Sequence, residues 1–194
     1  MNLTQLIQLM HHRWNIAILA ELDRTAGAKF ITLVNRLRLS RSSLTRCLDS
    51  LIAQGLVRRN SGYGHPMRPE YLLTRRGQAL SRDCHALVEV LGKKRQESFA
   101  FRKWTLPLIA AIGGRRIRFG ELKYALSTVS PRALTLGLKE LEQRRWIRRE
   151  VTEDYPPTTG YRLTQEAIPV WRALEELCAT AALRRSGASP PPAS

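Results

Sequence analysis

The chain contains an internal repeat, and this repeat limits the possible folds more than any other feature. Trp14 opens the stretch WNIAILAEL, and Trp104 opens the similar stretch WTLPLIAAI 90 residues later. The same offset relates four further pairs: Ser40 and Ser130, Pro66 and Pro156, Tyr71 and Tyr161, Thr74 and Thr164. Two copies are too few for a solenoid, which stacks a longer series of repeats. The repeat therefore predicts two consecutive domains with one fold, over residues 1–96 and 97–183.

Hydrophobic spacing predicts three helices at the start of the first copy. The first covers residues 3–22, with a break at residues 11–12, and the second covers residues 29–38. The third covers residues 40–54, and Ser40 occupies its N-cap position, where a hydroxyl accepts a hydrogen bond from a free backbone N–H. Apolar residues at helical spacing should form one buried stripe along this third helix: Leu44, Cys47 or Leu48, and Leu51.

A two-stranded hairpin and a closing helix follow in the first copy. Gly55 is placed to end the third helix, because glycine readily adopts the left-handed conformation found there. Residues 56–60 and 70–74 have the composition of short strands, and the basic, turn-rich segment SGYGHPMRP lies between them. Residues 77–91 return to helical spacing and predict the closing helix.

The second copy predicts the same elements in the same order. Ser130 is the N-cap of its third helix, residues 130–143, and Pro131 takes the first helical position, where a missing N–H is tolerated. The buried stripe of this helix consists of Leu134, Leu138 and Leu141. WIRREV and GYRLT form the strands, a closing helix covers residues 167–183, and residues 184–194 form a disordered tail.

A helix, a helix-turn-helix and a two-stranded hairpin, in this order, are the elements of a winged helix. We therefore expect a mainly α fold with small β-hairpins (α+β), built as two tandem winged helix-turn-helix domains. In such a domain the third helix can enter the major groove of DNA, and the hairpin can reach the backbone or the minor groove.

The charge of the chain also points to nucleic acid. The formal net charge is +16, from 32 Lys and Arg against 16 Asp and Glu, and the sequence pI is about 11.0. Residues 1–96 carry +10 and residues 97–194 carry +6. A protein this basic usually binds a polyanion. Hydrophobic residues make up 43%, enough for a packed core, and no apolar run is long enough to span a membrane. We expect a cytoplasmic, nucleoid-associated protein without a membrane partner.

The outer face of residues 40–54 is the first candidate DNA-reading surface. Arginine can pair with guanine through two hydrogen bonds, and serine and threonine can contact bases or phosphates. The candidate residues of the first copy, including those of the hairpin, are Ser40, Arg41, Ser42, Ser43, Thr45, Arg46, Arg59, Tyr63, His65 and Arg68. An ordinary solvated helix face is the alternative interpretation of this pattern.

The second copy is expected to read DNA less well. Its candidate residues are Ser130, Arg132, Thr135, Lys139, Arg148 and Arg149. However, Leu136 stands where the first copy has Arg46, and the second hairpin loop contains Glu153 and Asp154. We therefore expect Arg46→Ala to weaken specific DNA binding more than Lys139→Ala does.

The sequence contains no catalytic pattern that we recognise. It has no P-loop, no glycine-rich dinucleotide motif, no HExxH and no nucleophile elbow. The three cysteines are odd in number and far apart, which suits neither a disulfide framework nor a zinc site: Cys47, Cys84 and Cys178. We expect no enzyme activity, no metal and no cofactor.

The order of these motifs resembles that of the HxlR-type winged helix regulators of bacteria. Their features are a basic residue and Trp at the first core helix, a basic residue and Phe before the second, and a Ser that opens the recognition helix. The first copy shows Arg13-Trp14, Lys29-Phe30, Leu39-Ser40, Gly55-Leu56-Val57-Arg58, Pro66 and Tyr71-Leu72-Leu73-Thr74. The second shows Lys103-Trp104, Arg118-Phe119, Val129-Ser130, Trp146-Ile147-Arg148, Pro156 and Tyr161-Arg162-Leu163-Thr164.

The resemblance implies sequence-specific binding of double-stranded DNA and transcriptional control, usually by a homodimer of single-domain chains. This chain has two domains, so it forms either a monomeric pseudo-dimer or a homodimer. Some members sense oxidants through a cysteine before the Trp helix, but residues 2–13 contain no cysteine. The alternative function is a tandem winged helix module for protein docking or for chromosome organisation, with non-specific DNA binding.

Overall fold

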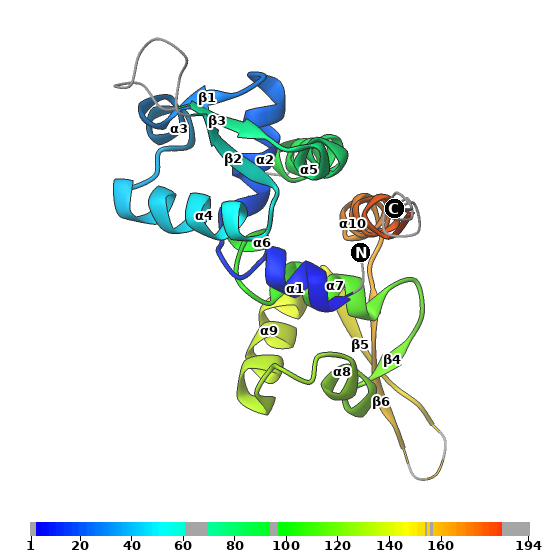
Figure 1. Cartoon of the computed structure of the whole chain (residues 1–194). Helices are drawn as coiled ribbons and strands as arrows, with labels where there is room; N and C mark the ends of the chain where they lie inside the picture. The colour runs from blue at the N-terminus through cyan, green and yellow to red at the C-terminus, as the bar shows by residue number, and fades with distance from the viewer. Residues whose placement is uncertain (1–2, 61–69, 94–96, 154, 156, 184–194) are drawn as a thin grey trace, which may run out of the picture.

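A computed structural model describes residues 3–60, 70–93, 97–153, 155 and 157–183 of the chain. The first half has the order helix, helix, strand, helix, helix, hairpin, helix (Figure 1). Its elements are α1 (Leu3–Leu9), α2 (Asn15–Arg24), β1 (Ala28–Lys29), α3 (Phe30–Leu37), α4 (Arg41–Ala53), β2 (Val57–Asn60), β3 (Glu70–Leu73) and α5 (Arg75–Lys93). The expected break in the first helix is confirmed, because α1 ends at Leu9 and α2 begins at Asn15.

The second half repeats this order. Its elements are α6 (Glu97–Ala100), α7 (Thr105–Ile112), β4 (Ile117–Arg118), α8 (Phe119–Ala125), α9 (Pro131–Gln143), β5 (Ile147–Val151), β6 (Thr159–Leu163) and α10 (Ile168–Leu183). Each half has an antiparallel three-stranded sheet of the same topology, β1-β3-β2 in the first and β4-β6-β5 in the second. The expected mainly α fold, with two winged helix-turn-helix units, is confirmed.

The two recognition helices, α4 and α9, begin and pack as expected. Ser40 Oγ accepts a hydrogen bond from the backbone N–H of Ser43 at 3.2 Å, and Ser130 Oγ accepts one from Ala133 at 3.2 Å. Gly55, with φ +66°, follows α4 in the left-handed conformation. The predicted stripes are buried in both helices: Leu44, Cys47, Leu48 and Leu51 in α4, and Leu134, Leu138 and Leu141 in α9.

Other repeated residues hold equivalent turns together. The hydroxyl of Thr74 donates to the carbonyl of Gly55 at 2.6 Å, and that of Thr164 donates to the carbonyl of Arg145 at 2.5 Å. Each bond ties the last strand of a hairpin to the end of the recognition helix. The threonine landmarks of the repeat therefore mark a contact that both halves need.

Two short strands and one short helix were not expected from the sequence. The strands β1 and β4 contain two residues each, so they are too short to show the alternation that identifies a strand. Each forms because it pairs with the inner strand of its hairpin, Ala28 opposite Tyr71 and Ile117 opposite Tyr161. The helix α6 is too short to be stable through its own helical propensity. Its buried side chains hold it in place.

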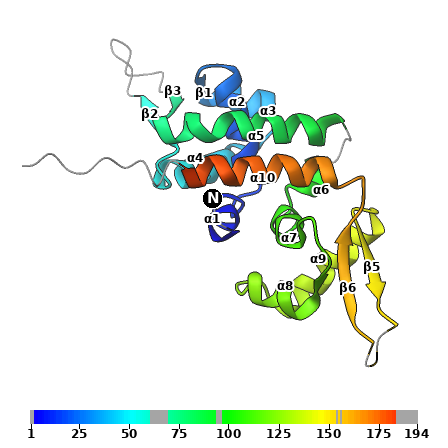
Figure 2. The same cartoon turned by 90° about the vertical axis from the view of Figure 1, so that its right-hand side faces the viewer.

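A helical layer joins the halves. The two closing helices, α5 and α10, lie side by side, seen end-on in Figure 1 and along their lengths in Figure 2. Near them, α1 of the first half packs against α7 of the second half. Arg13 also donates to the carbonyl of Ser98 at 2.8 Å, and the rings of Trp14 and Phe101 meet edge-on at 6.0 Å. The closing helices thus pair within one chain.

Candidate nucleic-acid interface

The first recognition helix presents a polar face opposite its buried stripe. The exposed residues on and beside this face are Ser40, Arg41, Ser42, Thr45, Arg46 and Asp49. The stripe fixes the rotation of α4 against the core, so these residues point to solvent as a set. Guanidinium groups and hydroxyls gathered in the first turns of a helix can donate to base edges and to phosphates.

Several of these side chains already make bonds within α4. Ser40 caps the helix and also donates to the hydroxyl of Ser43 at 2.9 Å, so both serines are engaged in starting the helix. The hydroxyl of Thr45 donates to the carbonyl of Arg41 at 3.0 Å. Arg46 donates through Nε to the carbonyl of Ser42 at 3.4 Å, a bond that uses only one of its N–H groups. The guanidinium groups of Arg41 and Arg46 are therefore the strongest candidates for base contact.

The second recognition helix has a less polar face. Arg132, Thr135 and Lys139 are exposed, as the sequence predicts. Ser130 caps α9, and the hydroxyl of Thr135 donates to the carbonyl of Pro131 at 2.9 Å. Leu136 leaves 53% of its surface exposed at the position of Arg46. A leucine there can contact only apolar groups, such as the methyl group of thymine.

The arginines of the hairpins lie on open strands. Arg58 and Arg59 are both exposed on β2, and Arg148 and Arg149 are both exposed on β5. Neighbours in a strand point to opposite faces, so both faces of each hairpin are open to solvent at this level. Tyr63, His65 and Arg68, the other candidates of the first hairpin, lie outside the described residues.

The sequence interpretation did not anticipate how Glu150, a residue of the second hairpin, affects the charge of that hairpin. Its carboxylate accepts from Arg148 Nε at 2.8 Å and lies 3.5 Å from Arg162 Nε. The first half has Asn60 at the equivalent position. Arg148 and Glu150 are two residues apart in one strand, so the alternation of side chains was the available signal. The carboxylate offsets part of the positive charge of the second hairpin.

The described residues contain no cluster of side chains that suits metal binding. No group of three or more His, Cys, Asp or Glu side chains among them could hold a metal ion. Burial raises the pKa of all three cysteine thiols, Cys47, Cys84 and Cys178, which keeps them protonated and poorly nucleophilic. Within the same residues, no helix is long and apolar enough to cross a lipid bilayer.

Known proteins resemble parts of the chain. The chain is 36% identical over 77 residues to an uncharacterised HTH-type transcriptional regulator of Halalkalibacterium halodurans, covering 39% of this chain and 68% of the relative. It is 33% identical over 76 residues to a regulator of the same description from Methanothermobacter thermautotrophicus, covering 39% of this chain and 58% of the relative. A solved MarR-family regulator from Enterococcus faecalis is 32% identical, with a TM-score of 0.42, over 49% of this chain and 89% of its own.

The family comparison covers both halves. The HxlR-like helix-turn-helix family matches residues 9–98, and it matches a second time at residues 101–186. The two matches include both recognition helices, both hairpins and both closing helices. The chain therefore belongs to the HxlR-like helix-turn-helix family and carries two consecutive copies of its domain.

Proposed function

We propose that this protein is a transcriptional regulator that binds double-stranded DNA in a sequence-specific manner. The observation that carries the proposal is the exposed face of α4, where Arg41, Ser42 and Arg46 stand together at the start of a helix anchored by a buried stripe. The family supports it, and so do the two relatives, which are both named as HTH-type transcriptional regulators. DNA binding of this kind needs no catalytic group. We place the protein at the nucleoid in the cytoplasm.

Both recognition helices take part in this proposal. In Figure 1, α4 and α9 lie on the same side of the molecule, opposite α5 and α10. Residues 40–54 and 130–143 each enter a major groove, while the hairpin arginines contact the backbone or the minor groove. The net charge of +16 brings the protein to DNA, and the face of α4 selects the sequence.

The two helices read different bases. Arg46 suits guanine, because a guanidinium can donate to O6 and N7 together. Leu136 suits thymine, because its exposed side chain can pack on the C5 methyl group. The preferred site is therefore asymmetric, with a guanine in one half-site and a thymine in the other.

The chain acts as a single-chain pseudo-dimer in this proposal. The pairing of α5 with α10 inside one chain supports it, because these are the surfaces that two chains would otherwise share. The two family matches likewise support a division into domains at residues 1–96 and 97–183. One chain then covers two half-sites one DNA turn apart.

Selection of bound fragments from genomic DNA, followed by sequencing, tests the specific part of the proposal. We expect enrichment of one asymmetric motif, and failure to enrich any motif would contradict specific regulation. Light scattering with footprinting tests the pseudo-dimer. A two-chain complex that covers four half-sites would rule it out.

Exposed apolar side chains keep the docking alternative open to test. Tyr124 is 89% exposed and Val151 is 60% exposed, and both belong to the second half. For a docking or chromosome-organising module, DNA affinity should fall steeply with salt and show no preference between the selected motif and random DNA. A titration against both DNAs at several salt concentrations separates the two functions.

A further inference from the structure

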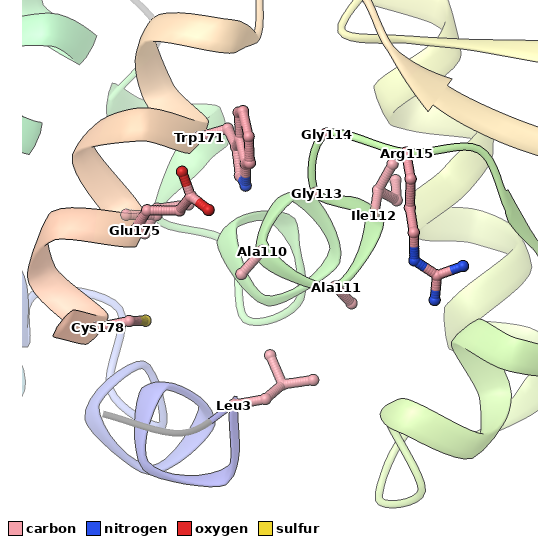
Figure 3. Close-up of a pocket in the computed structure, with 11 residues that line it drawn as sticks. Leu3, Ala110, Ala111, Ile112, Gly113, Gly114, Arg115, Trp171, Glu175 and Cys178 are labelled. Atoms are coloured by element: carbon pink, nitrogen blue, oxygen red, sulfur yellow. The ribbon is translucent and has the colours of Figure 1, made fainter. Parts of the chain in front are cut away.

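A cavity of about 510 Å³ lies where α1, α7 and α10 meet, and we call it the α7–α10 cavity (Figure 3). Its walls include Leu3 from the first half and Ala110, Trp171, Leu174 and Glu175 from the second. This volume is in the range of small-molecule sites, which are mostly apolar with a few polar groups that fix orientation. The cavity is separate from the exposed faces of α4 and α9.

The first half packs its closing helix differently. There α5 lies along α2, and the buried hydroxyl of Ser81 donates to Asp23 Oδ1 at 2.6 Å. In the second half, Trp171 replaces Ser81, and Gly113 and Gly114 replace Asp23 and Arg24. The larger side chain holds α10 away from α7, and α10 packs mainly along α5.

The glycines allow the indole to lie close to the backbone. A Cβ atom on Gly114 would come within 2.9 Å of the ring of Trp171, so a larger residue would displace it. Gly113 has φ +59°, a conformation that L-residues rarely adopt. The sequence change from Asp-Arg to Gly-Gly therefore accompanies the change from Ser to Trp, and all three residues line the cavity.

The cavity is lined by one carboxylate, that of Glu175, which is exposed to solvent. Figure 3 shows the carboxylate of Glu175 beside the indole of Trp171, on the side that faces Ala110. Among the residues that the structure describes, no ion pair to Glu175 is formed. Arg115 also lines the cavity, but its guanidinium points away from Trp171 and pairs with Glu121 at 3.1 Å. The carboxylate of Glu175 and the indole of Trp171 thus line the cavity side by side.

We propose that the α7–α10 cavity binds a small hydrophobic organic cation. The face or edge of Trp171 packs on the ligand, Glu175 pairs with its positive charge, and Leu3, Ala110 and Leu174 cover its apolar part. Cations bind the faces of tryptophan rings, and a carboxylate at close range adds to this attraction. Because recognition depends on charge and apolar surface, we define the ligand by its chemical class and not as a single compound.

The position of the cavity gives the ligand a role in regulation, a consequence that rests on the proposed function. The wall formed by α7 leads directly into the second helix-turn-helix, whereas α10 packs on α5 of the first half. A ligand between them fixes how the second DNA-reading unit is held against the first. Bound ligand therefore changes the relative position of α4 and α9, and with it the DNA affinity.

Two probes of one shape and opposite charge test the proposal. Tetraphenylphosphonium and tetraphenylborate are titrated into the full chain by calorimetry without DNA. The phosphonium should bind, although the net charge of +16 favours the borate elsewhere on the surface. Glu175→Gln should weaken phosphonium binding by about two- to fivefold, the effect of losing an exposed ion pair. Glu176→Gln, at the next position of α10, should leave it unchanged.

A second variant guards against an effect on folding. Ala110→Phe fills the cavity and keeps Glu175, so it should also abolish phosphonium binding while thermal unfolding stays cooperative. Phosphonium binding that persists in Ala110→Phe, or equal losses in Glu175→Gln and Glu176→Gln, would overturn the proposal. Repeating a DNA titration with phosphonium then tests the regulatory step alone. An unchanged DNA affinity would overturn that step and leave DNA binding itself intact.

Discussion

The two halves of the chain share one order of elements but differ in how their closing helices pack. In the first half, α5 lies against α2 and a hydrogen bond from Ser81 to Asp23 closes the contact. In the second half, α10 packs on α5 instead, and Trp171 stands over Gly114. Both halves keep the caps and buried stripes of their recognition helices. The comparison shows that the helix-turn-helix tolerates a change of helix partner as long as its own core is kept.

The largest expected effect comes from Trp146→Ala, because the core of the second half depends on this side chain. Trp146 is 1% exposed and packs edge-on against Phe99 at 5.3 Å, whereas the first half has Leu56 at this position. We expect the free energy of unfolding to fall by about 3–5 kcal/mol, as for other buried aromatic residues replaced by alanine. Urea unfolding followed by circular dichroism measures the loss.

Tyr155→Ala is the matched control for Trp146→Ala. Tyr155 is also an aromatic residue of the second half, but it is fully exposed. Its replacement should change the free energy of unfolding by less than about 0.5 kcal/mol. Similar losses in the two variants would show that burial of Trp146 does not stabilise the second half.

The next largest effect concerns the two recognition helices. Arg46→Ala should weaken binding to the selected DNA motif by about 1–3 kcal/mol and relax the preference at one base position. Lys139→Ala should weaken binding to all sequences by a smaller amount and reduce the dependence on salt. Mobility-shift titrations with the selected motif and with scrambled DNA measure both. Equal losses of motif affinity would contradict the ranking of the two helices.

The helix caps provide a third comparison. Ser40→Ala should destabilise the protein by about 1 kcal/mol, because the N–H of Ser43 loses its acceptor. Ser130→Ala should have about half this effect, since Pro131 pre-sets the first turn of α9 and brings no N–H. Thermal unfolding measures both. Ser40→Asp is the control: it keeps a cap and should restore stability, while its negative charge should still weaken DNA binding.

The sequence predicted the parts of the fold that are encoded locally. The caps at Ser40 and Ser130 and the leucine stripes follow from residue type and spacing over a few turns, and the structure confirms them. The strands β1 and β4 were missed because two residues carry no pattern and form only by pairing with a distant strand. The partner of α10 was left open for the same reason, since long-range packing around Trp171 decides it.

The candidate site was predicted to a similar degree. The exposed face of α4 follows from the stripe on its other side, so the exposure of Arg41 and Arg46 was predicted from spacing alone. The ion pair between Arg148 and Glu150 was not anticipated. Nor was the α7–α10 cavity, which requires Leu3 of the first half to meet α10 of the second. Such contacts across the chain have no signature in a single short stretch.

The smallest expected effect concerns Glu21, whose ion pairs join two helices of the first half. Its carboxylate accepts from Arg24 at 2.9 Å and from Arg36 at 2.9 Å, and so it ties α2 to α3. The second half has Ala111 at this position, on the wall of the α7–α10 cavity. Glu21→Gln keeps an acceptor oxygen but removes the charge, so we expect a loss of only about 0.5–1 kcal/mol at neutral pH.

The pH dependence of stability tests whether the charge of Glu21 causes this stabilisation. Burial alone would raise the pKa of Glu21, but the hydrogen bonds and charges of Arg24 and Arg36 outweigh it and lower the pKa below its ordinary value of about 4.5. The stabilisation is therefore complete above that value and is lost as the pH falls through the lower pKa of the folded state. The wild type and Glu21→Gln should differ in urea unfolding at pH 7 and converge in acid.

Glu140→Gln breaks an exposed pair with Arg102 and should change stability at neither pH. An effect of Glu140→Gln as large as that of Glu21→Gln would mean that the half-buried position of Glu21 has no special role.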